Sequence, residues 1–154
     1  MNKHFENTRK DYKKNEESKK LKDEFDSLKF KEDWIKTEAD ENMIEYCSKI
    51  AKILVDVKVT SSQLRNIYGE ILRIKMKRNK RIDSKNDLIL LKPKLYYNNS
   101  RMQKELGKEI FNKFIKNHLE KAIKIAIDNF NNDKIFNNFH NYFEAILAYH
   151  KYWD

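Results

Sequence analysis

The sequence contains very few of the residues that interrupt regular structure or form covalent cross-links. Its 154 residues include two glycines, one proline and one cysteine. So few Gly and Pro residues argue against a turn-rich β-protein, because tight turns depend on them. The single cysteine, Cys47, excludes a disulfide framework and a thiolate metal cluster, and its place on an apolar stripe predicts a buried side chain. We therefore predict an all-α protein with long helices.

Long hydrophobic runs are also absent. No stretch approaches the ~20 apolar residues that a membrane-spanning helix needs, and the N-terminus lacks the apolar segment of a signal peptide. We expect neither export nor a membrane span. Together with the low cysteine content, this predicts a cytoplasmic protein.

The charge of the chain is concentrated in one segment. Residues 60–106 hold 12 Lys and Arg against 4 Asp and Glu, which gives this segment +8 of the net charge of +9. Residues 1–40, in contrast, hold 11 residues of each sign. A single electropositive segment indicates a polyanion as the partner.

A helical pattern begins inside the basic segment. Thr60, Ser61 and Ser62 are favoured N-cap residues and precede a periodic apolar pattern. At about 100° per residue the apolar side chains fall in one arc. The opposite arc contains the basic side chains Arg65, Arg73, Lys77, Lys80 and Arg81. We interpret this helix as having one face for a core and one for phosphates. A basic face that is merely solvated is the alternative.

The spacing of apolar residues predicts a compact bundle of about five helices after a charged arm. Residues 1–32 carry balanced charge and few apolar side chains, so we expect a charged N-terminal arm, partly helical or flexible. Residues 33–154 form the predicted helical-bundle domain, with Trp34 and Ile35 starting its packed part. Its predicted helices cover 39–57, a stretch from 61, 93–106, 108–130 and the last residues from 132 or 133.

Three features divide these helices. Residues 78–86 are polar and charged, which predicts an exposed loop. Pro93 should break or kink a helix, because it lacks an amide hydrogen and clashes with the preceding turn. Gly107 is expected to separate the helix before it from the helix 108–130. The apolar residues of 108–130 cover about half the circumference, which predicts the central helix.

The last helix carries an aromatic stripe. Phe139, Tyr142, Phe143 and other aromatic residues share one arc, and at this spacing core packing is favoured over a platform for base stacking. The same arcs place His118 and His150 in the core.

We find no pattern of residues that supports catalysis. The histidines, His4, His118, His140 and His150, have no spacing that would join three of them at a metal. There is no P-loop, dinucleotide fingerprint, nucleophile elbow or cluster of carboxylates. We therefore predict no enzyme activity, no catalytic residue, no metal and no cofactor.

Three stretches together resemble one family. They are TSSQLRNIYGEI (60–71), LLKPKLYYNNSR (90–101) and FHNYFEAILAYHKY (139–152). In this order they resemble the small helical subunit of the type III-A CRISPR interference complex, the Csm complex. The resemblance covers roughly residues 39–153, and the sequence differs from the family pattern in its long charged arm and at Tyr97-Asn98-Asn99.

The resemblance implies a helical antiviral subunit without nuclease activity of its own. Several copies would associate along a filament with other Csm subunits and line the channel where CRISPR guide RNA pairs with target RNA. By motif position, Arg65 and Arg101 would be the RNA contacts. Arg73, Lys77, Lys80 and Arg81 are added by the helical wheel alone. A helical protein–protein adaptor or scaffold is the alternative function, and a basic DNA-binding protein is a third.

Overall fold

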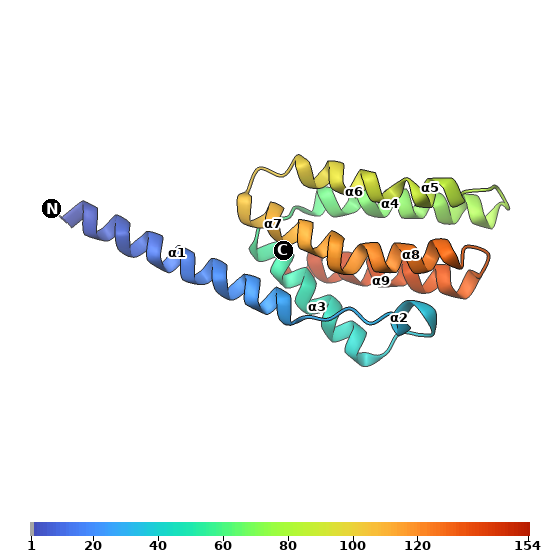
Figure 1. Ribbon diagram of the computed structural model, residues 1–154, viewed down its shortest axis with the longest axis horizontal. Coiled ribbons are helices and arrows are strands. Elements are labelled where there is room, and N and C mark those ends of the chain that lie inside the picture. Colours follow the sequence, from blue (N-terminus) through green and yellow to red (C-terminus); the bar gives the residue numbers. More distant parts are fainter. Residues whose placement is uncertain (1) are drawn as a thin grey trace.

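Helices account for most of residues 2–154, the part of the chain that the computed structural model describes (Figure 1). The elements are α1 (Asn2–Ser27), α2 (Asp33–Lys36), α3 (Glu41–Asp56), α4 (Ser61–Asn79), α5 (Lys85–Ile89), α6 (Leu91–Ser100), α7 (Glu105–Phe114), η1 (Ile115–Leu119), α8 (Glu120–Asp128) and α9 (Asp133–Trp153). Only Leu90 separates α5 from α6, and α7, the π-helical turn η1 and α8 form one continuous helix. No strand occurs in residues 2–154, so the all-α prediction is confirmed. The prediction of about five helices did not include α2 and α5, and it gave α1 only as an arm that is partly helical or flexible.

The starts of three helices are fixed by side-chain caps. Asp40 accepts a hydrogen bond from the amide of Met43 at the start of α3. At the start of α4, Thr60 and Gln63 form a capping box, in which each side chain binds the backbone amide of the other residue. The side chain of Asn132 caps α9. The predicted starts at Thr60 and Asn132 are therefore confirmed.

The loop predicted over residues 78–86 is shorter than expected. Helix α4 continues to Asn79 and only residues 80–84 connect it to α5. The last turn of α4 is stabilised by contacts with a distant part of the chain. Arg78 donates hydrogen bonds to the carbonyl of Phe130, between α8 and α9, and to Asp133 at the start of α9.

Pro93 does not break a helix where we predicted it to. It lies in the first turn of α6, where an amide has no partner within the helix, so its missing N–H costs nothing. The interruption falls at Leu90, and α6 ends at Ser100 rather than Leu106.

Gly107 does not end a helix but lies inside α7. A Cβ atom at this position would be 2.4 Å from the carbonyl oxygen of Val57. The glycine therefore allows α7 to approach the end of α3, and this close contact explains its presence better than the predicted break does.

The bundle is built around α9 and the continuous helix α7–η1–α8. Helix α9 packs against α2, α3, α4 and α8. In the continuous helix, the α7 part contacts α1, α3 and α6, and the α8 part contacts α2 and α5. Figure 1 shows α4, α5 and α6 along one side of this central pair and α2 and α3 along the other. The predicted aromatic core of α9 is confirmed for Phe136, Phe139, Tyr142 and Phe143, whereas Trp153, which belongs to the same predicted arc, is 39% exposed at the end of the helix.

Helix α1 extends away from the bundle (Figure 1). Only Phe25, near its end, is buried within it. Phe25 is 1% exposed and its ring packs against those of Phe114 and His118. The packed core therefore begins at Phe25, earlier than the predicted start at Trp34. No helix among residues 2–154 is both long and apolar enough to cross a membrane.

Candidate nucleic-acid interface

Helix α4 has two distinct faces. Leu64, Ile67, Ile71 and Ile74 are buried and face the core. Arg65 and other polar residues on the opposite side are exposed. The helix thus has the amphipathic arrangement predicted from its sequence.

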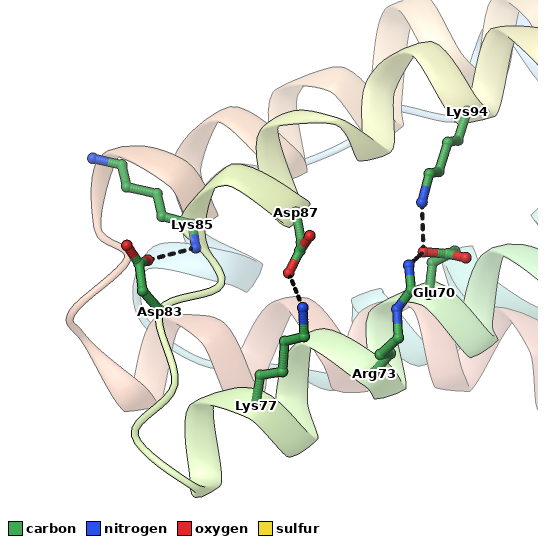
Figure 2. Close-up of polar contacts among 7 residues, drawn as sticks. All are labelled: Glu70, Arg73, Lys77, Asp83, Lys85, Asp87 and Lys94. Carbon is green, nitrogen blue, oxygen red and sulfur yellow. Dashed lines mark hydrogen bonds and ion pairs between the residues drawn. The ribbon is translucent and has the colours of Figure 1, made fainter.

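Two of the predicted basic residues, Arg73 and Lys77, belong to a set of ion pairs that joins α4 to α5 and α6 (Figure 2). The Nζ atom of Lys77 lies 2.7 Å from Oδ2 of Asp87, on α5. Glu70 pairs with both Arg73 and Lys94, and its Oε2 atom is 2.8 Å from Nζ of Lys94, on α6. The charges of Arg73 and Lys77 are therefore partly compensated.

These contacts leave the cluster with a cationic excess. Three cations, Arg73, Lys77 and Lys94, share two carboxylates. The hydrogen bond from Lys77 lowers the pKa of the Asp87 carboxyl below its ordinary value, so Asp87 stays ionised and the pair keeps its charges at neutral pH.

Arg65, Lys80 and Arg81 are exposed, and no ion pair joins them to another side chain within residues 2–154. Arg65 lies in the second turn of α4, whereas Lys80 and Arg81 follow its last turn. At 1.5 Å per residue, Arg65 lies about 21 Å along the helix axis from Asn79, the last residue of α4, so Arg65 and the Lys80–Arg81 pair are near opposite ends of the helix. Arg81 has a left-handed backbone with φ of 58°.

Arg65 lines a groove between α4 and the second half of α9. The groove is also lined by Ser61, Tyr68, Glu144, Leu147, Ala148 and Lys151. Lys151 adds a second cation and Glu144 an anion, while Leu147 and Ala148 provide an apolar part. The groove is thus mixed in charge, and Arg65 is the only one of the predicted site residues that lines it.

Arg101 follows α6 and is held by an aromatic side chain. Its guanidinium lies 5.6 Å from the ring centre of Tyr97, and Nη1 donates a hydrogen bond of 3.2 Å to the Tyr97 hydroxyl. Because α5 and α6 run back along α4, the end of α6 lies near the start of α4 (Figure 1). Arg101 is therefore at the Arg65 end of the helix pair.

Arg78 is a further basic residue of α4 that was not among the predicted site residues. Its side chain is only 10% exposed, and its guanidinium lies 4.6 Å and 4.4 Å from the ring centres of Phe130 and Phe136. It also donates a hydrogen bond of 2.7 Å to Oδ1 of Asp133. The helical wheel contains the signal, because Arg78 falls within the apolar arc of α4. Lys94 was overlooked because its contact with α4 depends on how α6 packs.

The buried histidines are hydrogen-bonded inside the core. Nδ1 of His118 lies 2.6 Å from the hydroxyl of Tyr46, which lies 2.7 Å from that of Tyr142. Burial, with a smaller contribution from Lys121, lowers the pKa of His118 to about 4. Nε2 of His150 donates to the carbonyl of Val59 at 2.8 Å. The predicted core positions of both histidines are confirmed.

Tyr46 and its neighbour Cys47 are buried and stay protonated at neutral pH. Burial raises the pKa of the Tyr46 hydroxyl far above its ordinary value and the pKa of the Cys47 thiol to about 12. The predicted burial of Cys47 is confirmed. Within residues 2–154, no three His, Cys, Asp or Glu side chains gather where they could hold a metal ion.

Residues 37–154 match the family model for Csm2 of type III-A. The chain belongs to the Csm2 family. It is thereby a small subunit of the type III-A CRISPR Csm complex, as the three stretches of resemblance indicated. No curated protein and no solved structure matches the chain. The Csm2 match includes α3 to α9 and begins after α1 and α2.

Proposed function

We propose that this Csm2-family protein is a non-catalytic RNA-contacting subunit that lines the channel for guide and target RNA and stabilises the filament. The observation that carries the proposal is the row of cations along α4. Arg65, Lys80 and Arg81 are exposed at its two ends, and the partly compensated pair Arg73 and Lys77 lies between them. Arg101 adds a cation beside the Arg65 end.

Such a subunit must hold RNA whose sequence changes with every guide. Contacts to phosphate and ribose suit this task, because they carry no sequence information. The rigid helix α4 presents Arg side chains that can grip two phosphate oxygens and Lys side chains that supply movable charge. Self-association of several copies along one RNA would convert weak single contacts into tight binding.

The paired cations Arg73 and Lys77 have a different role in this proposal. Their carboxylate partners, Glu70 and Asp87, hold them in fixed positions, and Lys77 is directed toward α5 (Figure 2). A phosphate near these pairs still meets an excess of positive charge, because Arg73 and Lys94 share the single carboxylate of Glu70. The phosphate gains less from them, however, than from Arg65 or Arg81.

The buried histidines support a non-catalytic protein, and the free, buried Cys47 suits the reducing cytoplasm that we propose as its location. His118 and His150 are hydrogen-bonded within the core, so neither is available to a substrate. Catalysis in the complex would then belong to other subunits. We propose that this chain needs no cofactor or metal.

A protein adaptor is the second candidate function. It is favoured by the ion pairs of Arg73 and Lys77, which neutralise part of the basic face without any nucleic acid. In that case α4 would serve the bundle, and its remaining cations would only be solvated.

Binding of RNA at increasing salt concentration tests the proposed function. For single-stranded RNA, log K should fall linearly with log salt, with a slope of about −0.7 per neutralised phosphate. Arg65→Ala combined with Arg81→Ala should flatten the slope by about 1.4 units and weaken binding similarly for unrelated RNA sequences. Arg73→Ala combined with Lys77→Ala should have a smaller effect, because these charges already have partners.

The matched control removes two cations from another helix. Lys116 and Lys121 are exposed on η1 and α8, and Lys116→Ala with Lys121→Ala lowers the net charge by the same amount. This control should bind RNA nearly as well as the parent. Equal binding by the parent, the control and the Arg65/Arg81 variant would contradict the proposal and favour the adaptor.

A further inference from the structure

The outer half of α1 carries a compact aromatic and basic patch. Its residues, which we call the arm patch, are Phe5, Thr8, Arg9, Tyr12 and Lys13, and they line one shallow depression. Phe5 is 74% exposed and Tyr12 is 66% exposed. Exposed aromatic rings of this size are costly to leave in water, so a repeated pair on one helix face indicates a contact surface.

The arm patch lies on the side of α1 opposite to the residues that pack on the bundle. At about 100° per residue, Phe5, Arg9, Tyr12 and Lys13 fall within an arc of about 100°. Leu21 and Phe25, which pack on the bundle, fall on the opposite side of the same helix. The helix is continuous from Asn2 to Ser27, so the patch cannot reach its own bundle without breaking α1. Its partner must therefore be another molecule.

The composition of the arm patch suits a single-stranded polyanion. Two aromatic rings alternate with two cations along one face, and no carboxylate lines the depression, with Glu16 following one turn later on the same face. Cations attract phosphates, and flat aromatic rings stack on unpaired bases of any sequence. In a duplex the base faces are covered by their neighbours, so the rings would gain little from it.

We propose that the arm patch is a second RNA-binding site, which takes unpaired RNA outside the channel lined by α4. Phe5 and Tyr12 stack on bases, while Arg9 and Lys13 bind the adjacent phosphates. The site lies outside residues 37–154, the part matched by the Csm2 family model. The inference rests on the proposed function only for the identity of RNA as the ligand. It assigns a separate surface and a different form of RNA.

Substitutions on the two faces of α1 test this site. The probe is a labelled single-stranded RNA without internal pairing, compared with a duplex of equal length, and binding is measured by fluorescence anisotropy with the full chain. Phe5→Ala with Tyr12→Ala should weaken single-strand binding about tenfold, from the loss of stacking. The same variant should bind the duplex like the parent.

The charge of the arm has a matched control. Lys10 and Lys14 are exposed on the other side of α1, so Lys10→Ala with Lys14→Ala removes the same charge from the face that the patch does not occupy. Arg9→Ala with Lys13→Ala should weaken single-strand binding several-fold more than this control does. An equal loss in both variants would overturn the site, because it would show only the attraction of a charged arm.

The outcomes separate this site from the proposed function. Normal single-strand binding by the Phe5/Tyr12 variant, together with weak binding by the Arg65/Arg81 variant, would overturn the arm patch and leave the α4 interface intact. Parent-like binding by both variants would overturn both. If the Phe5/Tyr12 variant bound RNA normally but failed to join the other Csm subunits, the patch would be a protein-docking surface and the RNA site would be wrong.

Discussion

His118 is a buried residue whose protonation should make the stability of the bundle depend on pH. Its ring accepts a hydrogen bond at Nδ1 when Tyr46 donates, and Tyr46 in turn accepts from Tyr142. This direction of donation requires a neutral imidazole with its proton on Nε2. Protonation of His118 would remove the acceptor and place a charge among the buried rings of Phe25 and Phe114.

The first prediction follows from the pKa of His118. Because the folded pKa is about 4 and an unfolded histidine has a pKa of about 6.5, the unfolded state binds the proton first. This residue's contribution to the stability is therefore complete above about pH 6.5 and is lost as the pH falls toward 4, by up to about 3 kcal/mol. Urea unfolding at several pH values between 7 and 4.5 measures the loss.

Replacement of the histidine identifies its share of that loss. His118→Gln should lower stability at pH 7, because packing and the bond to Tyr46 are disturbed. Its unfolding free energy should nevertheless fall less steeply with acid than that of the parent. Parallel pH profiles for the two proteins would show that His118 does not resist protonation.

The sequence predicted which side chains face the core better than it predicted which side chains they contact there. The apolar arcs correctly placed His118, His150 and Cys47 in the core. They could not show that Tyr46 and Tyr142 meet His118, because this depends on how three helices pack. Arg78 was overlooked for a different reason, since its charge was counted and its position within the apolar arc was not used.

At the scale of helices, the two glycines have opposite roles. Gly69 lies on the exposed side of α4, where an added Cβ would meet nothing within 4 Å. Gly107 lies in α7, where a Cβ would be 2.4 Å from the backbone oxygen of Val57. The same Gly→Ala substitution therefore tests helix propensity at one position and close helix packing at the other.

The second prediction concerns this pair. Gly69→Ala should raise the free energy of unfolding by about 0.5–1 kcal/mol, the gain expected for alanine over glycine inside a helix. Gly107→Ala should lower it by about 1–3 kcal/mol, because α7 or the end of α3 must shift. Chemical denaturation of both variants provides the measurement. If Gly107→Ala were also stabilising, the close approach of α7 to Val57 would be wrong.

Helix starts were easier to predict than helix ends. Thr60 and Asn132 act through residues three positions ahead, so their caps can be recognised locally. The end of α4 depends on the contact of Arg78 with the distant Phe130, and the position of Arg78 in the apolar arc indicates burial without identifying this partner. Pro93 misled the prediction because the same residue is tolerated in a first turn and harmful in a helix interior.

At the scale of the whole molecule, the stability of the bundle should not depend on the outer part of the arm. Within α1, burial is confined to Phe25. The third prediction is that removal of residues 2–14 changes the free energy of unfolding by less than about 0.5 kcal/mol, because only exposed side chains are lost. Removal through Leu28 should cost about 3–5 kcal/mol, since the Phe25 ring leaves the core.

A point variant provides the control for these truncations. Phe25→Ala in the full chain should reproduce most of the loss caused by the longer truncation, which thermal or urea unfolding can measure. A large loss on removal of residues 2–14 would contradict the prediction, because it would show that the outer arm stabilises the bundle through contacts that Figure 1 does not suggest.

The fold class and the family could be predicted from the sequence, whereas the interface could only be outlined. Helical periodicity and the scarcity of Gly and Pro are properties of the chain itself, so the all-α bundle followed from them. The wheel of α4 gave the basic face, but it could not show that Asp87 and Lys94 approach from another helix. Which cations are compensated depends on that packing.

The π-helical turn η1 keeps the long helix Glu105–Asp128 in phase with its neighbours. Counted as a regular helix at about 100° per residue, its buried positions from Gly107 to Ala126 would spread over about 220°. The π turn adds one residue to a turn, which rotates the following residues back and narrows the spread to about 180°. Loss of a single residue here would rotate α8 against α9 and turn apolar side chains such as Ile123 toward solvent. The length of this helix is therefore as constrained as its composition.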